Sequence, residues 1–130
     1  MKVFRGLPNA EARRPCALTI GNFDGVHRGH RELLARVADA AARLGVDSAV
    51  MTFEPHPREY FAHLSGDESR APLRIANLRD KLQALEQCGV DRVIVEHFGA
   101  SFASMSPQRF IDDVLVAGMH VKWLIVGDDF

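Results

Sequence analysis

The sequence predicts an α/β fold: a Rossmann-like, doubly wound parallel sheet with helices packed against it. Short apolar runs, typical of buried strands, alternate along the chain with stretches whose apolar residues recur at helical spacing. A turn rich in Gly, Asn and Asp joins the apolar run 16–20 directly to the first helical pattern. Because short parallel strands are joined by helical crossovers, this order favours a right-handed, doubly wound sheet.

The first half of the chain supplies the opening strands and a long helix. The expected elements are, in order, a short strand near Val3, a strand over 16–20, a helix over 28–44 and a strand over 48–53. The helix has one apolar face and ends at Gly45. Its inward residues are expected to be Leu33, Leu34, Val37, Ala38, Ala41 and Leu44. Residues 54–57 are expected to form a loop because they contain two prolines.

The second half repeats the alternation. The expected elements are one helical turn over 59–63, a helix over 78–88, a strand over 92–96, a helix from 107 to about 116 and a strand over 121–126. Asn77 and Ser106 are suitable N-cap residues for the two longer helices. Leu78, Leu82 and Leu85 are expected to face inward, as are Phe110, Ile111, Val114 and Leu115. The sequence ends directly after the last strand, without a further covering helix, so we expect a domain truncated after its fourth core strand.

Composition excludes several classes of protein. The formal net charge of −1 gives no electrostatic reason to expect nucleic acid or an anionic membrane as a partner. No apolar stretch has the length of a membrane span or the pattern of a signal peptide. Cys16 and Cys88 are expected to be reduced thiols, which indicates the cytoplasm.

The start of the first long helix is the strongest candidate site. His27 and His30 lie one turn apart on one helix face, and Gly29 between them lets a ligand approach the backbone. Free N–H groups at a helix start favour phosphate. The run matches neither the Lys-containing phosphate loop nor the dinucleotide fingerprint. Asp24 with both histidines could also bind a metal, but no fourth ligand accompanies them, so no metal site is predicted.

Three segments carry a family resemblance. Residues 21–30, Gly-Asn-Phe-Asp-Gly-Val-His-Arg-Gly-His, resemble the first motif of the cytidylyltransferase-like nucleotidyltransferases, whose mark is His-x-Gly-His. The Gly-x-Phe-Asp-Gly-Val-His form resembles the prokaryotic FAD synthetases, which are bifunctional riboflavin kinases and FMN adenylyltransferases. Residues 52–57, Thr-Phe-Glu-Pro-His-Pro, resemble that family's second motif, and residues 126–130, Val-Gly-Asp-Asp-Phe, the start of its third. The three segments in this order indicate the flavin branch.

The resemblance implies a nucleotidyltransferase type of fold and an FMN adenylyltransferase domain over 1–130, without the riboflavin kinase domain. The implied reaction is adenylyl transfer from ATP to FMN, giving FAD and pyrophosphate, with Mg²⁺ arriving with ATP. His27 and His30 would be the catalytic residues, stabilising phosphates in the transition state. The implied ATP-binding residues are Gly21, Asn22, Phe23, Asp24, Gly25 and Gly29. The implied flavin-binding residues are Pro55, His56, Pro57 and Asp129.

Other interpretations remain open at this point. Another adenylyltransferase of the superfamily would act on a pantetheine or nicotinamide phosphate, and an incomplete domain would bind nucleotide or flavin without turnover. Phe23 could be a core residue and Asp24 a helix cap. Residues 55–57 could be only a rigid loop. His63, His97 and His120 lie in no motif and are expected to be surface or structural residues.

Overall fold

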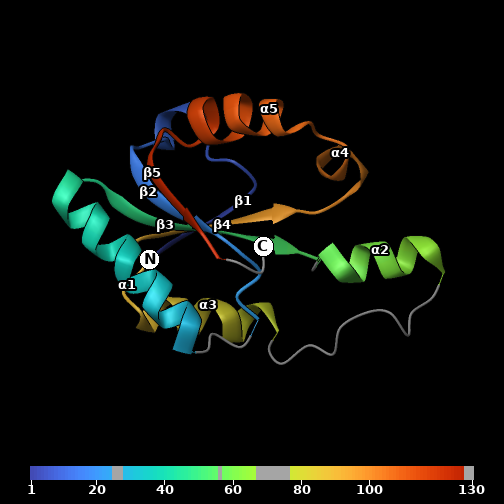
Figure 1. Cartoon of the computed structure of the whole chain (residues 1–130), viewed down its shortest axis with the longest axis horizontal. Coiled ribbons are helices and arrows are strands. Elements are labelled where there is room, and N and C mark those ends of the chain that lie inside the picture. The colour runs from blue at the N-terminus through green and yellow to red at the C-terminus, as the bar shows by residue number, and fades with distance from the viewer. Residues whose placement is uncertain (25–27, 56, 67–76, 128–130) are drawn as a thin grey trace.

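Five parallel strands form the centre of the computed structural model, in the spatial order β1-β4-β3-β2-β5 (Figure 1). The structure describes residues 1–24, 28–55, 57–66 and 77–127. The strands are β1 (Lys2–Arg5), β2 (Cys16–Ile20), β3 (Asp47–Glu54), β4 (Arg92–His97) and β5 (Val121–Val126). Each expected strand is present, and the predicted bounds of β2 and β5 are confirmed.

Helices cover both faces of the sheet, as predicted for a doubly wound fold. They are η1 (Ala10–Ala12), α1 (Arg28–Leu44), α2 (Pro57–Ser65), α3 (Leu78–Gln87), α4 (Ala100–Ala103), α5 (Pro107–Arg109) and η3 (Phe110–Gly118). The last is a π-helix that continues α5. α1 and α3 lie on one face, and α4 and α5 on the other (Figure 1). Asn77 and Ser106 accept the capping hydrogen bonds predicted for them. No helix among the described residues is both long and apolar enough to cross a bilayer.

Alternate strand residues fill the two layers of the core. The layer under η3 contains Cys16, Leu18, Ile20, Met51, Phe53, Ile94, Val114 and Leu115. The layer under α1 and α3 contains Phe23, Leu34, Val50, Leu85 and Val93, together with Ala17, Val37, Ala40 and Ala41. Both faces of the central strands are therefore buried, which explains why those strands are almost continuously apolar.

Three apolar positions lie in a different environment from the one that periodicity predicts. Ala38 and Leu44 of α1 are exposed, because Ala40 and Ala41 complete the inward face and Leu44 lies in the final turn before Gly45. Ile111 is 46% exposed. The wider winding of the π-helix moves it off the face that an α-helical period predicts. The longer α2, from Pro57 to Ser65, also replaces the expected single turn.

The apolar residues of the outer strand β5 point to both sides of the sheet. Trp123 and Ile125 pack against the α1 layer. Leu124 and Val126, on the other side of the strand, are 42% and 37% exposed. Successive strand residues face opposite sides of the sheet. Trp123 and Ile125 therefore face the α1 layer, while Leu124 and Val126 face the other side.

The connections place a switch point between β2 and β5. From β2 the chain passes to the neighbouring β3 and then to β4, whereas the connection after β4 returns to the far side of β2. The two sets of crossovers lie on opposite faces (Figure 1). In open α/β sheets, ligands bind outside the carboxyl ends of the strands at such a point.

Candidate functional site

Strand register brings the three motif segments to one edge of the sheet. Ile20 of β2 pairs with Met51 of β3 on one side and with Val126 of β5 on the other. Gly21, Thr52 and Gly127 therefore follow at the same carboxyl edge, although they are far apart in sequence. The predicted site residues Gly25, His27, His56 and Asp129 lie outside the described residues.

The first turn of α1 is unusual for a helix start. It reads Arg28-Gly29-His30-Arg31 and contains no acidic residue. Because the positive end of the helix dipole lies there, carboxylates are normally favoured and basic groups are not. Arg28 and Gly29 are exposed and His30 is half-buried. A basic helix start at the switch point of the sheet suits a bound anion better than it suits the isolated helix.

Phe23 forms the base on which His30 rests. Its side chain is 1% exposed, and its ring centroid lies 4.8 Å from that of His30, at an interplanar angle of 49°. Its φ of +52° is in the left-handed region, which a bulky residue rarely occupies. On Gly21, a Cβ atom would lie 2.9 Å from Cε2 of this ring. The structure therefore brings Gly21, Phe23 and His30 together, and the core position considered for Phe23 is confirmed.

A hydrogen-bonded relay lies beneath the same loop. Lys81 Nζ, on α3, donates to Thr52 Oγ1 of β3 at 3.1 Å. Thr52 Oγ1 donates in turn to the backbone carbonyl of Asn22 at 3.0 Å. Lys81 is 2% exposed, although lysine is among the residues least often buried. Lys81 belongs to no sequence motif and was not predicted as a site residue; the available signal was its place on the apolar helix face between Leu78 and Leu85.

The Asn22 side chain has an unmet hydrogen-bonding requirement. Its Oδ1 atom is buried and has no hydrogen-bond partner among the described residues. Buried polar atoms in native proteins are normally paired, and an exception requires an explanation. A donor group of a ligand bound at this edge would satisfy the atom.

Aromatic side chains gather beside the second motif segment. The Phe53 ring lies 5.6 Å from Phe98 and 5.3 Å from Phe102, and Phe98 lies 5.5 Å from Tyr60 and 5.8 Å from Phe61. Phe61 is 52% exposed. Pro55, which follows a cis peptide bond, lies between Phe53 and this part of α2 in the chain. This aromatic cluster was not predicted from the sequence, because its members come from β3, α2 and the segment around α4.

The titratable groups near this edge do not form a metal centre within the described residues. No three His, Cys, Asp or Glu side chains in 1–24, 28–55, 57–66 and 77–127 are grouped so that they could hold a metal ion. Glu96, near the end of β4, has a raised pKa because burial desolvates its carboxylate. A backbone hydrogen bond and the neighbouring His97 offset part of that shift.

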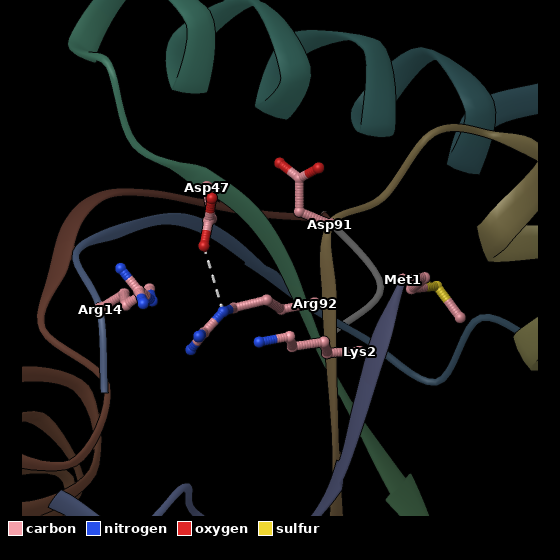
Figure 2. Close-up of a pocket in the computed structure, with 6 residues that line it drawn as sticks. All are labelled: Met1, Lys2, Arg14, Asp47, Asp91 and Arg92. Atoms are coloured by element: carbon pink, nitrogen blue, oxygen red, sulfur yellow. Dashed lines mark ion pairs between the residues drawn. The ribbon is translucent and has the colours of Figure 1, made fainter. Parts of the chain in front are cut away.

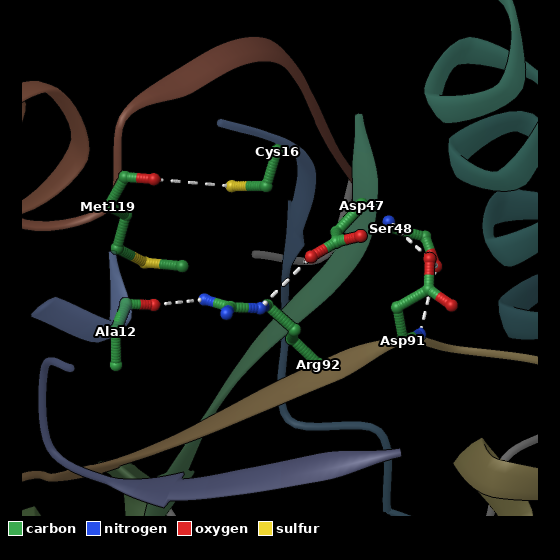
Figure 3. Close-up of polar contacts among 7 residues, drawn as sticks. All are labelled: Ala12, Cys16, Asp47, Ser48, Asp91, Arg92 and Met119. Carbon is green, nitrogen blue, oxygen red and sulfur yellow. Dashed lines mark hydrogen bonds and ion pairs between the residues drawn. The ribbon is translucent and has the colours of Figure 1, made fainter. Parts of the chain in front are cut away.

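A charged pocket lies at the opposite, amino edge of the sheet. Its volume is about 310 Å³, and it is lined by Met1, Lys2, Arg14, Asp47, Asp91 and Arg92 (Figure 2). Arg92 Nε lies 3.2 Å from Asp47 Oδ2, and its Nη1 donates to the Ala12 carbonyl at 2.8 Å. Asp91 accepts from the backbone N–H and the hydroxyl of Ser48 (Figure 3). These charged groups join β3, β4 and η1, so we assign them a structural role.

Both cysteines are free thiols, as the composition indicated. Cys16 Sγ donates to the Met119 carbonyl at 3.5 Å (Figure 3). Burial raises the pKa of Cys16 to about 11, with a smaller opposing effect of Arg92. Cys16 is therefore a protonated core residue at neutral pH.

Comparisons with known proteins agree with this arrangement. The family model described as FAD synthetase matches residues 9–130. The chain is 46% identical over 132 residues to the bifunctional riboflavin kinase/FMN adenylyltransferase of Escherichia coli K12. It is 47% identical over 131 residues to the enzymes of the same name from Haemophilus influenzae and Pseudomonas fluorescens. These matches cover 100% of the chain but only 41%, 41% and 40% of the relatives, so the chain spans about two-fifths of their length.

A solved structure shows the same fold at lower identity. A Streptococcus pneumoniae protein whose title calls it a macrolide-efflux protein superposes with a TM-score of 0.78 at 24% identity. The superposition covers 99% of this chain and 42% of that one. At this identity the likeness concerns the fold alone, whereas the family model spans nearly all of the sequence. The chain belongs to the FAD synthetase family.

Proposed function

We propose that this chain transfers the adenylyl group of ATP to FMN. An oxygen of the FMN phosphate attacks the α-phosphorus of ATP and forms a new P–O bond. The bond from the α-phosphorus to the oxygen bridging to the β-phosphate breaks, so that pyrophosphate leaves and FAD remains. The observation that carries the proposal is the first turn of α1, which is basic and contains no acidic residue and lies at the switch point between β2 and β5.

The ATP side of the proposed site is the loop after β2 and the start of α1. The nucleophile needs no general base, because the second pKa of a phosphomonoester is about 6 and the group is largely dianionic at neutral pH. The enzyme must align the phosphates and stabilise the charge on them. We assign this task to His27 and His30, with Gly21, Asn22, Phe23, Asp24, Gly25 and Gly29 forming the remainder of the ATP site. The Oδ1 atom of Asn22, which is buried and has no hydrogen-bond partner in the part of the chain that the structure describes, supports the assignment, because the adenine amino group and the ribose hydroxyls are donors.

The flavin side of the proposed site is the loop after β3 and the segment after β5. We assign Pro55, His56, Pro57 and Asp129 to it, with the carboxylate of Asp129 accepting from the imide N–H of the flavin ring. The exposed ring of Phe61 in the aromatic cluster supports this side, because a flat apolar ring system is stabilised by offset or edge contacts with aromatic side chains.

The proposed reaction also implies a metal cofactor, a second domain in the native protein and a cellular compartment. Mg²⁺ would enter with ATP, keeping phosphate oxygens and waters as most of its ligands. The names of the relatives join FMN adenylyltransferase to riboflavin kinase, and these relatives are longer than this chain. We therefore propose a riboflavin kinase domain in the same native protein, which would supply FMN. Nucleic acid and membrane are not among the proposed partners, and the cytoplasm is the proposed compartment because free thiols persist there.

Product analysis tests the proposed reaction. The full chain encoded by the native gene is incubated with ATP, Mg²⁺ and FMN, and the products are separated by liquid chromatography. Parallel reactions replace FMN with a pantetheine phosphate or a nicotinamide mononucleotide. We expect FAD and pyrophosphate in equal amounts. Faster adenylylation of either alternative acceptor, or binding of ATP and FMN without any product, would overturn the proposal.

A further inference from the structure

We propose that Lys81 is a positioning residue for the nucleotide loop, acting on His30 through Thr52, Asn22 and Phe23. The inference rests on the proposed function, because His30 is the group whose position it explains. Lys81 lies on α3, outside all three motif segments. Its contact with Thr52 nevertheless places it beneath the loop that leads into α1.

The direction of the hydrogen bonds makes the relay specific. A threonine hydroxyl has one proton to donate and two lone pairs to accept with. Because Thr52 donates its proton to the Asn22 carbonyl, it can contact Lys81 Nζ only as an acceptor. Lys81 occupies the accepting side of the oxygen and so orients the proton toward Asn22. Without this donor, the hydroxyl is free to rotate and to bond elsewhere.

The Asn22 carbonyl connects the relay to the backbone of Phe23. That carbonyl belongs to the peptide plane preceding Phe23, so holding it restrains one side of the backbone torsion φ of Phe23, which is +52°. A strained torsion of this kind persists only where its surroundings hold it in place. The bond from Thr52 is one such restraint, and burial of the Phe23 ring is another.

The Phe23 ring transmits this restraint to His30. The two rings lie 4.8 Å apart, and Gly21 lies against Phe23 so closely that no Cβ would fit. A small rotation of the Phe23 peptide plane would therefore move the surface on which the imidazole rests. Misplacement of a catalytic group by about 1 Å can cost on the order of a hundredfold in rate.

The buried position of Lys81 is consistent with this role. An amine removed from water costs free energy unless it is hydrogen-bonded, and the same helix face uses Leu78, Leu82 and Leu85 for packing. A fourth leucine would pack there without that cost. The hydrogen bond from Lys81 Nζ to Thr52 Oγ1 is one interaction that offsets the cost of burying this amine.

Nuclear magnetic resonance gives a test that does not depend on catalysis. In the full native chain, the ring current of Phe23 displaces the resonances of the His30 imidazole protons, and Phe23→Leu gives the reference without it. We expect Lys81→Met and Thr52→Val to move those resonances toward the reference at constant pH. Thr52→Ser, which keeps the hydroxyl, should leave them in place. Ile94→Val, which lowers stability in the opposite core layer, should also leave them in place.

Kinetics of the same variants complete the test. We expect Lys81→Met and Thr52→Val to lower kcat for FAD formation at least about tenfold, with KM for ATP little changed. The double variant should lose no more than the worse single variant, because both residues act through one bond to Asn22. If Lys81→Met does not fold, Thr52→Val with its Thr52→Ser partner carries the test, since valine has the same shape as threonine.

The outcomes separate this inference from the proposed function. Unchanged His30 resonances and unchanged kcat in Lys81→Met or Thr52→Val would overturn the positioning role. Multiplied losses in the double variant would also overturn it, because Lys81 would then act independently of Thr52. If the resonances move as expected but no protein in the series makes FAD, the relay is supported and the proposed function fails.

Discussion

At the scale of single residues, Phe23 combines an unfavourable backbone with a buried side chain. A left-handed φ costs a non-glycine residue about 1–3 kcal/mol. Burying an aromatic side chain of this size contributes about 1.5–3 kcal/mol. The two effects are of similar size, so the conformation depends on close packing around the ring, and Gly21 is part of that packing.

Gly21→Ala should therefore disturb the loop. The added Cβ would lie 2.9 Å from a ring that is 1% exposed and has little room to move. We expect a loss of about 1–3 kcal/mol in the free energy of unfolding, measured by urea denaturation. We also expect at least about a tenfold loss of FAD formation. The matched control is Gly21→Ala combined with Phe23→Leu, where a smaller side chain makes room; if stability is not partly restored, the clash is not the cause.

His30→Ala tests the proposed chemical role of the histidine pair. Loss of a donor that stabilises transition-state charge typically costs on the order of 10²–10³ in rate, so we expect at least a fall of about a hundredfold in kcat. KM for ATP should change little. His120→Asn is the matched control, since His120 is exposed and its φ of +52° suits asparagine. A His30→Ala variant with nearly the parent rate would remove His30 from the mechanism.

His56→Ala tests the flavin side. Pro55 and the aromatic cluster adjoin this position in the chain, so we expect KM for FMN to rise more than KM for ATP. His63→Ala, an exposed position on α2, serves as the control. Equal effects on both substrates, or none, would reduce residues 55–57 to a structural loop.

At the scale of elements, the strands were the most predictable part of the molecule. β2 and β5 have the bounds that the sequence pattern predicts, and β2 is buried along its whole length. The inward face of η3 was not predictable, because π-winding leaves no simple signature in a sequence. Lys81 was missed for a related reason: its role depends on Thr52, which reaches it only through the packing of α3 against β3.

Glu96, on β4, makes the stability of that strand's end depend on pH. Burial raises the pKa of this carboxyl, so the folded state holds its proton more tightly than the unfolded state does. The resulting stability is present below the unfolded pKa and is lost as pH rises through the folded pKa. We expect Glu96→Gln, which resembles the neutral acid, to raise the melting temperature relative to the parent at pH 7. The difference should disappear near pH 4, and a gain that is independent of pH would contradict this explanation.

At the scale of the whole molecule, the proposed site depends on loops from both sides of the switch point between β2 and β5. The loop after β2 carries the first motif, and Gly127 opens the third motif after the neighbouring β5. Asp129, the proposed site residue of the third motif, lies outside the described residues. Parallel strands align their carboxyl ends, and the register of Ile20 with Val126, which a sequence alone does not give, brings these loops to the same edge.

Expression of residues 1–130 alone, beside the same chain extended through the native sequence that follows Phe130, tests how much of the site this part supplies. Among the described strands β5 pairs only with β2, and its Leu124 and Val126 side chains are 42% and 37% exposed. The relatives are also more than twice as long as the matched region, which covers 41% of them. We therefore expect residues 1–130 to be less soluble than the extended chain.

We also expect residues 1–130 to form FAD at least about tenfold more slowly than the extended chain, because a ligand site at a switch point is completed by loops from both halves of the sheet. Binding of ATP, measured by calorimetry, should be weakened less, since the first turn of α1 is present in both proteins. Equal turnover by the two would show that the loops after β2, β3 and β5 are sufficient for the reaction.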